Sequence, residues 1–119
     1  MPATLPKCER LSGKTAAPDL IARGRWGRQE HLRYCFAEGS GLEFNRIIVS
    51  VPKKLFKRAV KRNLLKRRMR EAYRTQKELL ATKGVDILFV YSAEGETGTD
   101  VLRTEVARAL ERIDELCRK

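Results

Sequence analysis

A helical period in residues 57–81 limits the possible folds of this chain more than any other feature. With 3.6 residues per turn, apolar side chains gather on one side of the predicted helix and polar or cationic ones on the other. The apolar side consists of Leu65, Met69, Ala72, Tyr73, Gln76, Leu79 and Leu80. The polar side consists of Asn63, Lys66, Arg67, Arg70, Arg74 and Lys77. Because one side needs to be buried and the other does not, this helix must pack on a second layer of structure.

Strand-like runs stand on both sides of this helix. Residues 31–37 alternate between apolar and polar side chains, and residues 46–51 are rich in β-branched residues. Residues 85–91 are almost entirely apolar, which is typical of a strand buried on both faces. We expect the first two runs to pair as a hairpin. We also expect a strand–helix–strand crossover between parallel strands, formed by the run 46–51, the helix and the run 85–91.

Two further helices are predicted near the ends of the chain. A short one over residues 15–23 has Pro18 in its first turn and Gly24 after its end. Thr99 or Asp100 is expected to cap the last one, whose apolar residues keep the helical period. Residues 24–29 are predicted to be a turn-rich connector, and residues 1–10 to be disordered. The 119 residues therefore predict a single α+β domain, a two-layer sandwich of helices on a mixed sheet.

Positive charge is concentrated in one short part of the chain. Residues 53–74 contain 11 Lys or Arg and one acid, Glu71, whereas the formal net charge of the whole chain is +11. Since solubility alone needs no such concentration, we expect a polyanionic partner. The alternative is an ordinary solvated helix side, but such sides usually mix acids with bases.

Composition excludes several classes of function. No run of 18 apolar residues is present, so no membrane-spanning segment is expected. The three cysteines form no C-x-x-C pair, and His31 is the only histidine, so we predict no disulfide framework, no metal site and a reducing, cytoplasmic location. The sequence contains no spacing typical of a catalytic triad, a phosphate loop or a metalloprotease helix. No bound cofactor is predicted, and oligomeric state is left open.

The basic helix side is suited to RNA. Guanidinium groups bind phosphates through two hydrogen bonds, lysine adds a point charge, and Asn63 can both donate and accept. A DNA-binding helix would need a helix-turn-helix partner, which the sequence does not show. RNA that is recognised through phosphates and shape fits better.

The residues that carry these properties resemble the protein subunit of bacterial ribonuclease P. The stretch "VSVPKK" followed by "RAVKRNLLKRRMREAYR" is similar to that family's strand ending in Lys-Lys and its R-N-x-x-K-R-x-x-R-E helix. The matching residues are Lys53, Lys54, Arg62, Asn63, Lys66, Arg67, Arg70 and Glu71. The segments "ERLSGK" (9–14) and "GVDILFVY" (84–91) also match the family's pattern.

The resemblance implies an αβββαβα fold with a left-handed crossover and a fourth strand around residues 25–37. It also implies a role in 5′ maturation of precursor tRNA, in which the RNA subunit cleaves the phosphodiester with Mg²⁺. The expected partners are therefore ribonuclease P RNA and precursor tRNA. Residues expected to bind the catalytic RNA are Arg62, Asn63, Lys66, Arg67, Arg70 and Arg74. Residues expected to bind the single-stranded 5′ leader are Tyr34, Phe36, Ser50, Lys53 and Lys54.

The sequence departs from the family pattern at several positions. Leu64 stands where the family often has a third basic residue, and Ala17 and Ile21 stand where it often has phenylalanines that line the leader cleft. Two alternatives stay open at this point: a ribosomal or ribosome-assembly protein with a purely binding role, and a stand-alone nuclease. The RNA that co-purifies with the protein would separate the first alternative from a ribonuclease P subunit.

Overall fold

Three helices and four strands follow one another in the order that the family resemblance implies, αβββαβα. The structure is a computed structural model and describes residues 9–11 and 16–118. The elements are α1 (Ala16–Arg23), β1 (Arg25–Arg28), β2 (Leu32–Ala37), β3 (Arg46–Ser50), α2 (Ala59–Arg74), the short 3₁₀ helix η2 (Lys77–Leu79), β4 (Asp86–Tyr91) and α3 (Thr99–Cys117). The prediction of an α+β fold with helices on a mixed sheet is confirmed.

The four strands form one sheet in the order β1-β2-β4-β3. β2 is antiparallel to β1 and β4, whereas β3 runs parallel to β4. The expected hairpin between residues 31–37 and 46–51 is therefore wrong, because β4 lies between them. β4 takes this central place because nearly all its side chains are buried, which a strand between two neighbours achieves best. The crossover from β3 through α2 to β4 is confirmed, and its left-handed sense stays a prediction.

β1 is the strand that sequence reasoning treated as a connector. It has only four residues and pairs with β2 from Arg25 opposite Phe36 to Arg28 opposite Arg33. Gly27 lies opposite Tyr34, and a Cβ atom added to Gly27 would lie only 2.3 Å from Cζ of that ring. Glycine is therefore required here because the tyrosine ring leans over the edge strand.

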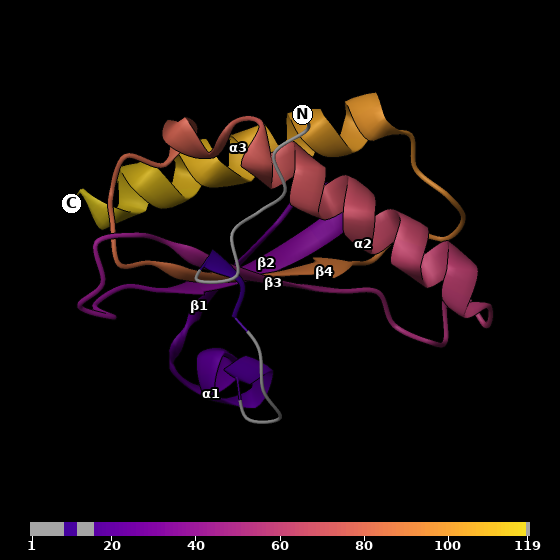
Figure 1. Cartoon of the computed structure of the whole chain (residues 1–119), viewed down its shortest axis with the longest axis horizontal. Coiled ribbons are helices and arrows are strands. Elements are labelled where there is room, and N and C mark those ends of the chain that lie inside the picture. The colour runs from indigo at the N-terminus through magenta and orange to yellow at the C-terminus, as the bar shows by residue number, and fades with distance from the viewer. Residues whose placement is uncertain (1–8, 12–15, 119) are drawn as a thin grey trace.

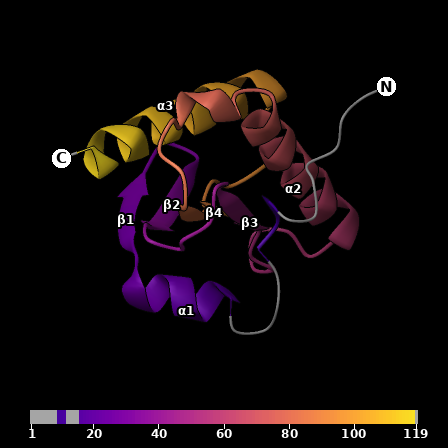
Figure 2. The ribbon, with the colours of Figure 1, turned by 60° about the vertical axis from the view of Figure 1, so that its left-hand side comes forward.

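Helices cover the two faces of the sheet unequally. α2 and α3 lie together over one face, and the short α1 lies on the other (Figures 1 and 2). The main core fills the space below α2 and α3, and it contains Leu65, Met69, Ala72 and Tyr73 from the predicted apolar side of α2. The smaller core under α1 consists of Leu20, Cys35, Ala37 and Leu88. The predicted amphipathic character of α2 is thus confirmed.

Element boundaries differ from the predictions at three places. The helix expected over residues 57–81 ends at Arg74 and is followed by η2. Gly98, and neither Thr99 nor Asp100, is the N-cap of α3. Residues 1–8 of the segment predicted to be disordered lie outside the described residues, whereas Glu9 forms an ion pair with Lys77 at 3.0 Å.

No helix within residues 9–11 and 16–118 is long and apolar enough to cross a membrane.

Asp114 holds the chain that follows η2 against α3. Its Oδ1 atom accepts hydrogen bonds from the backbone N–H groups of Ala81 at 3.1 Å and Thr82 at 3.0 Å, and from the Thr82 hydroxyl at 3.0 Å. Although desolvation acts in the opposite direction, these bonds hold the pKa of the Asp114 carboxyl below its usual value.

Replacing Asp114 by alanine is expected to lower the free energy of unfolding by about 1–3 kcal/mol, because two backbone donors lose their acceptor. Folding lowers the pKa of the Asp114 carboxyl, so its ionised form stabilises the folded chain. This stabilisation is complete above the pKa that the carboxyl has in the unfolded chain, and it is lost as the pH falls below about 4. Urea unfolding at neutral and acidic pH measures both effects. Glu111→Ala, which removes an exposed carboxylate of α3, is the control; an equal loss in both variants would contradict the expectation.

Candidate nucleic-acid interface

The basic residues of α2 fall into two groups that differ in their partners. Lys61 and Arg68 both pair with Glu96 in the loop before α3, at 2.9 and 2.7 Å. Arg74 binds Glu71 one turn earlier, at 2.7 Å. The hydrogen bonds from Lys61 and Arg68 lower the pKa of the Glu96 carboxyl, and that from Arg74 lowers the pKa of Glu71. These three cations therefore share two carboxylates within the chain.

Four other polar side chains of α2 form a continuous surface, which we term the α2 basic face: Asn63, Lys66, Arg67 and Arg70. Within the described ranges none of the four makes a hydrogen bond or an ion pair through its side chain. Their spacing of three or four residues places them on one side of the helix over a length of about 10 Å. The surface thus offers one amide and three cations to an external partner.

Arg70 lies near a second cation and has no ion-pair partner among the described residues. Desolvation, followed by the positive charge of Arg10, lowers the pKa of its guanidinium. Arg10 itself lies beside the edge strand, in a parallel bridge with Ile47 of β3. Two cations close together in a partly desolvated place are unfavourable unless an anion lies between them, and a phosphate with several oxygens suits two guanidinium groups.

The N-terminal end of α2 adds positive charge beside the α2 basic face. Its N-cap, Arg58, supplies no side-chain hydrogen bond, and its first turn contains no acid. The N-terminal end of a helix carries a partial positive charge, which acidic residues usually offset. Arg62 is occupied locally, because its Nη1 atom donates to the carbonyls of Phe56 at 2.7 Å and Lys57 at 3.0 Å. Arg62 and Arg74 are therefore the two expected RNA-binding residues that already have partners within the chain.

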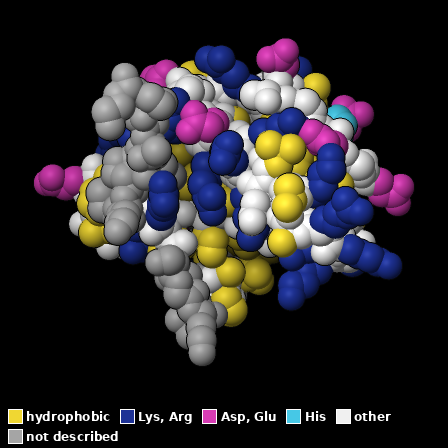
Figure 3. Space-filling view, turned by 45° about the vertical axis from the view of Figure 1, so that its right-hand side comes forward, with side chains coloured by type: hydrophobic (Ala, Val, Ile, Leu, Met, Phe, Trp, Pro, Cys, Tyr) yellow, Lys and Arg dark blue, Asp and Glu magenta, His cyan; other side chains and the backbone are white. Residues whose placement is uncertain are grey.

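The space-filling view shows how the basic side chains are distributed on the surface. In Figure 3, Lys and Arg side chains occupy much of the centre and right of the molecule, with a few acidic side chains between them. Hydrophobic side chains are exposed among the basic ones in small groups. A surface of this kind fits a phosphate backbone better than it fits an apolar protein partner.

The structure contradicts the expected position of Tyr34 and Phe36. Both rings are buried in the main core, with 3% and 1% of their surface exposed, under α2 and α3. The alternation along β2 was predicted correctly, but the face that turns toward α1 carries Arg33, Cys35 and Ala37. Neither ring can therefore stack on a nucleotide, and both belong to the packing of the fold.

Among the described residues, α1 covers one end of the sheet face that is turned toward it. Asp86, at the start of β4, is buried and binds Arg46 through two hydrogen bonds of 2.8 Å and Arg23 of α1 at 3.1 Å. These bonds hold α1 over the end of the sheet where β4 begins. At the opposite end of the same face, cross-strand pairing aligns Ser50, Val90, Arg33 and Arg28 in one row across all four strands.

Trp26 stands beside this row and is 46% exposed. The guanidinium carbon of Arg33 lies 5.3 Å from the centre of its indole ring, a cation–π arrangement. A groove of about 910 Å³ continues from Arg28 and Arg33 to Lys54, past the ends of β3 and β4. We term Trp26, Arg28, Arg33, Ser50 and Val90 the open sheet face.

The other expected leader-binding residues lie near this face. Ser50 belongs to it, Lys54 lines the groove, and Lys53 is exposed next to Lys54. On α1, Ile21 is 45% exposed, whereas Ala17 is half-buried. The structure thus brings Ser50 and Lys54 together with residues that sequence reasoning missed: Trp26, Arg28 and Arg33. The segment "RWGR" could have shown them, because an aromatic residue between arginines is typical of nucleic-acid surfaces.

These features define a class of protein: a small, basic α+β RNA-binding protein with a cationic helix and a separate aromatic and basic sheet face. The family model described as Ribonuclease P matches residues 5–114. The chain therefore belongs to the ribonuclease P protein family, and it is the protein subunit of that endoribonuclease.

Relatives agree with this membership, and solved structures share the fold. The ribonuclease P protein component of Borrelia turicatae is 39% identical over 80 residues, which cover 67% of this chain and 68% of that protein. The one of Chlorobaculum tepidum is 32% identical, with 92% and 82% covered. The ribonuclease P protein of Thermotoga maritima has a similar fold, with a TM-score of 0.77, 25% identity and coverage of 87% and 96%. The Staphylococcus aureus protein superposes with a TM-score of 0.76 at 22% identity, covering 90% and 96%.

Proposed function

We propose that the α2 basic face binds the RNA subunit of ribonuclease P. The observation that carries this proposal is the separation of charges on α2: three cations are paired with acids, while Lys66, Arg67 and Arg70 are left without one. Arg10 extends the face from α2 to β3 and adds a second guanidinium beside Arg70. Family membership favours this RNA over the ribosomal RNA of the alternative assignment.

The open sheet face is the proposed site for the 5′ leader of precursor tRNA. An unpaired base can stack on the exposed indole of Trp26, and Arg28, Arg33 and Lys54 can neutralise the phosphates that follow it. Ser50 offers a hydroxyl on the same row. Trp26 thus takes the role that was expected of Tyr34 and Phe36, and it supplies the aromatic surface that Ala17 and Ile21 lack.

Chemistry is assigned to the RNA subunit with its Mg²⁺ ions. Neither proposed surface places a histidine or a pair of carboxylates among its described residues, so we assign no general acid or base to them. The protein's part is to bind and position two RNA molecules, and we place this work in the cytoplasm.

Reconstitution tests the proposal. The purified chain alone is expected to leave precursor tRNA uncut, and to lower the Mg²⁺ concentration that the RNA subunit of the same cell needs for 5′ cleavage. Cleavage by the chain alone, after exhaustive removal of RNA, would show that it is a stand-alone nuclease. Co-purification with ribosomal RNA and no effect on the RNA subunit would favour the alternative binding role.

Replacing Trp26 by alanine is expected to weaken binding of precursor tRNA to the assembled enzyme by about 1–3 kcal/mol, the usual contribution of base–aromatic stacking. Mature tRNA lacks the leader, so its binding should stay the same. Because the indole is half-exposed, stability should change little. Titration of precursor and mature tRNA against the assembled enzyme measures the difference.

Two controls make this result specific. Trp26→Phe keeps a ring and should restore most of the preference for precursor tRNA. Val101→Ala shortens an exposed apolar side chain on α3 and should have no effect. Equal loss of precursor and mature tRNA binding in Trp26→Ala would place the leader elsewhere.

A further inference from the structure

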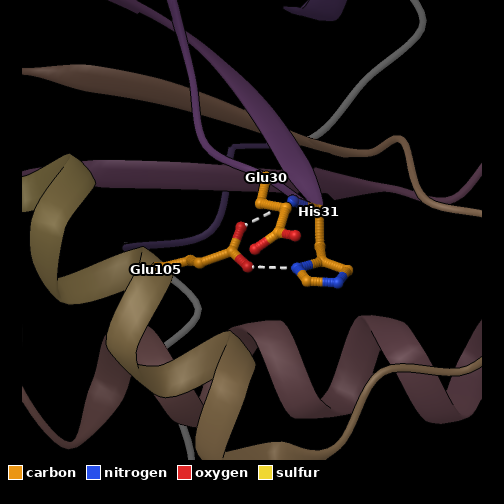
Figure 4. A group of neighbouring side chains, drawn as sticks. All are labelled: Glu30, His31 and Glu105. Atoms are coloured by element: carbon orange, nitrogen blue, oxygen red, sulfur yellow. Dashed lines mark hydrogen bonds and ion pairs between the residues drawn. The ribbon is translucent and has the colours of Figure 1, made fainter.

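A cluster of three possible metal ligands lies where the turn between β1 and β2 meets α3. Glu30 and His31 belong to the turn, and Glu105 reaches toward them from α3 (Figure 4). One ligand atom from each residue lies within 4.8 Å of the others. The cluster is outside the α2 basic face, and nothing in the proposed binding of RNA uses it.

Glu105 is the fixed member of the cluster. Its side chain is only 5% exposed. One carboxylate oxygen accepts the backbone N–H of His31 at 2.8 Å, and the other contacts Nδ1 of the His31 ring. The imidazole is therefore already oriented toward the carboxylate. Glu30 is exposed and free to rotate, so it can adjust to a ligand.

The charges of the cluster are not balanced by arginine or lysine. In the part of the chain that the structure describes, neither Glu30 nor Glu105 pairs with either residue type, although the chain contains 26 of them. The carboxylates of Glu71, Asp86 and Glu96 all have such partners. Two carboxylates that approach each other, one of them buried, are stabilised by a cation, and His31 supplies at most one positive charge.

We propose that Glu30, His31 and Glu105 bind one divalent transition-metal ion, Zn²⁺ or one of similar chemistry. The ligands are Nδ1 of His31 and one oxygen from each carboxylate. A site with imidazole and carboxylate ligands is common for zinc, whereas Mg²⁺ prefers oxygen ligands and retains its water. Tetrahedral zinc bonds of about 2.0–2.2 Å keep ligand atoms further apart than a hydrogen bond does. Nδ1 of His31 and the Glu105 oxygen that it contacts must therefore separate slightly, whereas the exposed Glu30 side chain can approach the ion. Water completes the coordination on the solvent side.

Metal binding replaces the hydrogen bond between His31 and Glu105. The metal takes the lone pair of Nδ1, so the ring binds as the neutral tautomer with its proton on Nε2. The ion then joins the β1–β2 turn to α3. Glu30 also lines the groove next to the open sheet face, so the ion would fix one wall of that groove.

The single histidine makes a direct test possible. In the ¹⁵N-labelled full chain, only His31 gives imidazole-nitrogen signals, which are distinct from the indole signal of Trp26. Addition of one equivalent of Zn²⁺ is expected to shift the Nδ1 resonance and leave Nε2 protonated, whereas an equal amount of Mg²⁺ should change neither. Calorimetric titration should show that Glu30→Gln and His31→Gln each weaken Zn²⁺ binding on the order of tenfold or more. Glu43→Gln, which removes an exposed carboxylate elsewhere, should bind as the unmodified chain does.

The same measurements can overturn the proposal. If Zn²⁺ leaves the His31 ring signals unchanged, the ion binds elsewhere, the cysteine thiols included, and the cluster serves only to hold the turn. The same conclusion follows if both variants bind Zn²⁺ as tightly as the unmodified chain. Because no RNA is present in these experiments, their outcome is independent of the proposed function.

Discussion

Replacing Arg67 and Arg70 together by alanine is expected to weaken binding to the RNA subunit of ribonuclease P by about 2–6 kcal/mol. Each charge-assisted hydrogen bond to a phosphate contributes about 1–3 kcal/mol, and neither guanidinium makes a hydrogen bond or an ion pair within the described residues. The slope of log affinity against log salt should also decrease by about 0.7–0.9 for each phosphate that the protein no longer neutralises. Titration of labelled RNA subunit at several salt concentrations measures both quantities.

Arg108 and Arg68 provide matched controls for this pair. Arg108→Ala removes an exposed arginine from α3, and Arg68→Ala removes one from α2 that is already paired with Glu96. Both should reduce RNA binding much less than the pair. Similar losses in all variants would mean that the RNA responds to total charge alone, and that the α2 basic face is not a defined binding surface.

Replacing Tyr34 by alanine is expected to lower the free energy of unfolding by about 3–5 kcal/mol, as truncation of a buried aromatic ring does. The ring packs in the main core and over Gly27, so its loss leaves a cavity between the sheet and the helices. Denaturant unfolding measures the change. Tyr34→Phe keeps the ring and should preserve most of the stability.

Tyr34→Ala also distinguishes core packing from leader binding. With the folded fraction held equal, this variant should bind precursor and mature tRNA in the same ratio as the unmodified protein, whereas Trp26→Ala should not. A Tyr34→Ala chain of nearly unchanged stability that selectively loses precursor tRNA would restore the original assignment of this residue to the leader.

The features that could be predicted from the sequence are those that side-chain periodicity determines. The apolar side of α2 and the burial of β4 on both faces follow from side-chain pattern alone, and both are confirmed. β1 was missed because four residues, one of them Gly27, give too short a pattern, and the close approach of the Tyr34 ring to that glycine leaves no local signal. The hairpin was predicted wrongly because β2 and β3 are neighbours in sequence, whereas in the sheet the almost fully buried β4 lies between them.

The candidate surfaces were predictable to different degrees. Residue type and spacing placed Asn63, Lys66, Arg67 and Arg70 on one side of α2, but only tertiary structure shows that Arg62 and Arg74 are occupied. For β2, alternation separates Tyr34 and Phe36 from Arg33 and Cys35 without saying which set faces α1. That choice depends on the packing of Leu20 against Cys35, which a single sequence does not contain.

The central position of β4 has a consequence for synthesis of the chain. The strand that joins β2 to β3 is the last of the four to leave the ribosome, so until residue 91 has emerged the sheet exists only as separate parts. During that interval α2 is already outside, with its apolar side uncovered and its cations free to meet RNA. Pairings so distant in sequence form slowly, and exposed strand edges favour aggregation meanwhile. Folding of this protein should therefore be limited by the arrival of β4, and chains that stop before it should remain unfolded and bind RNA without selectivity.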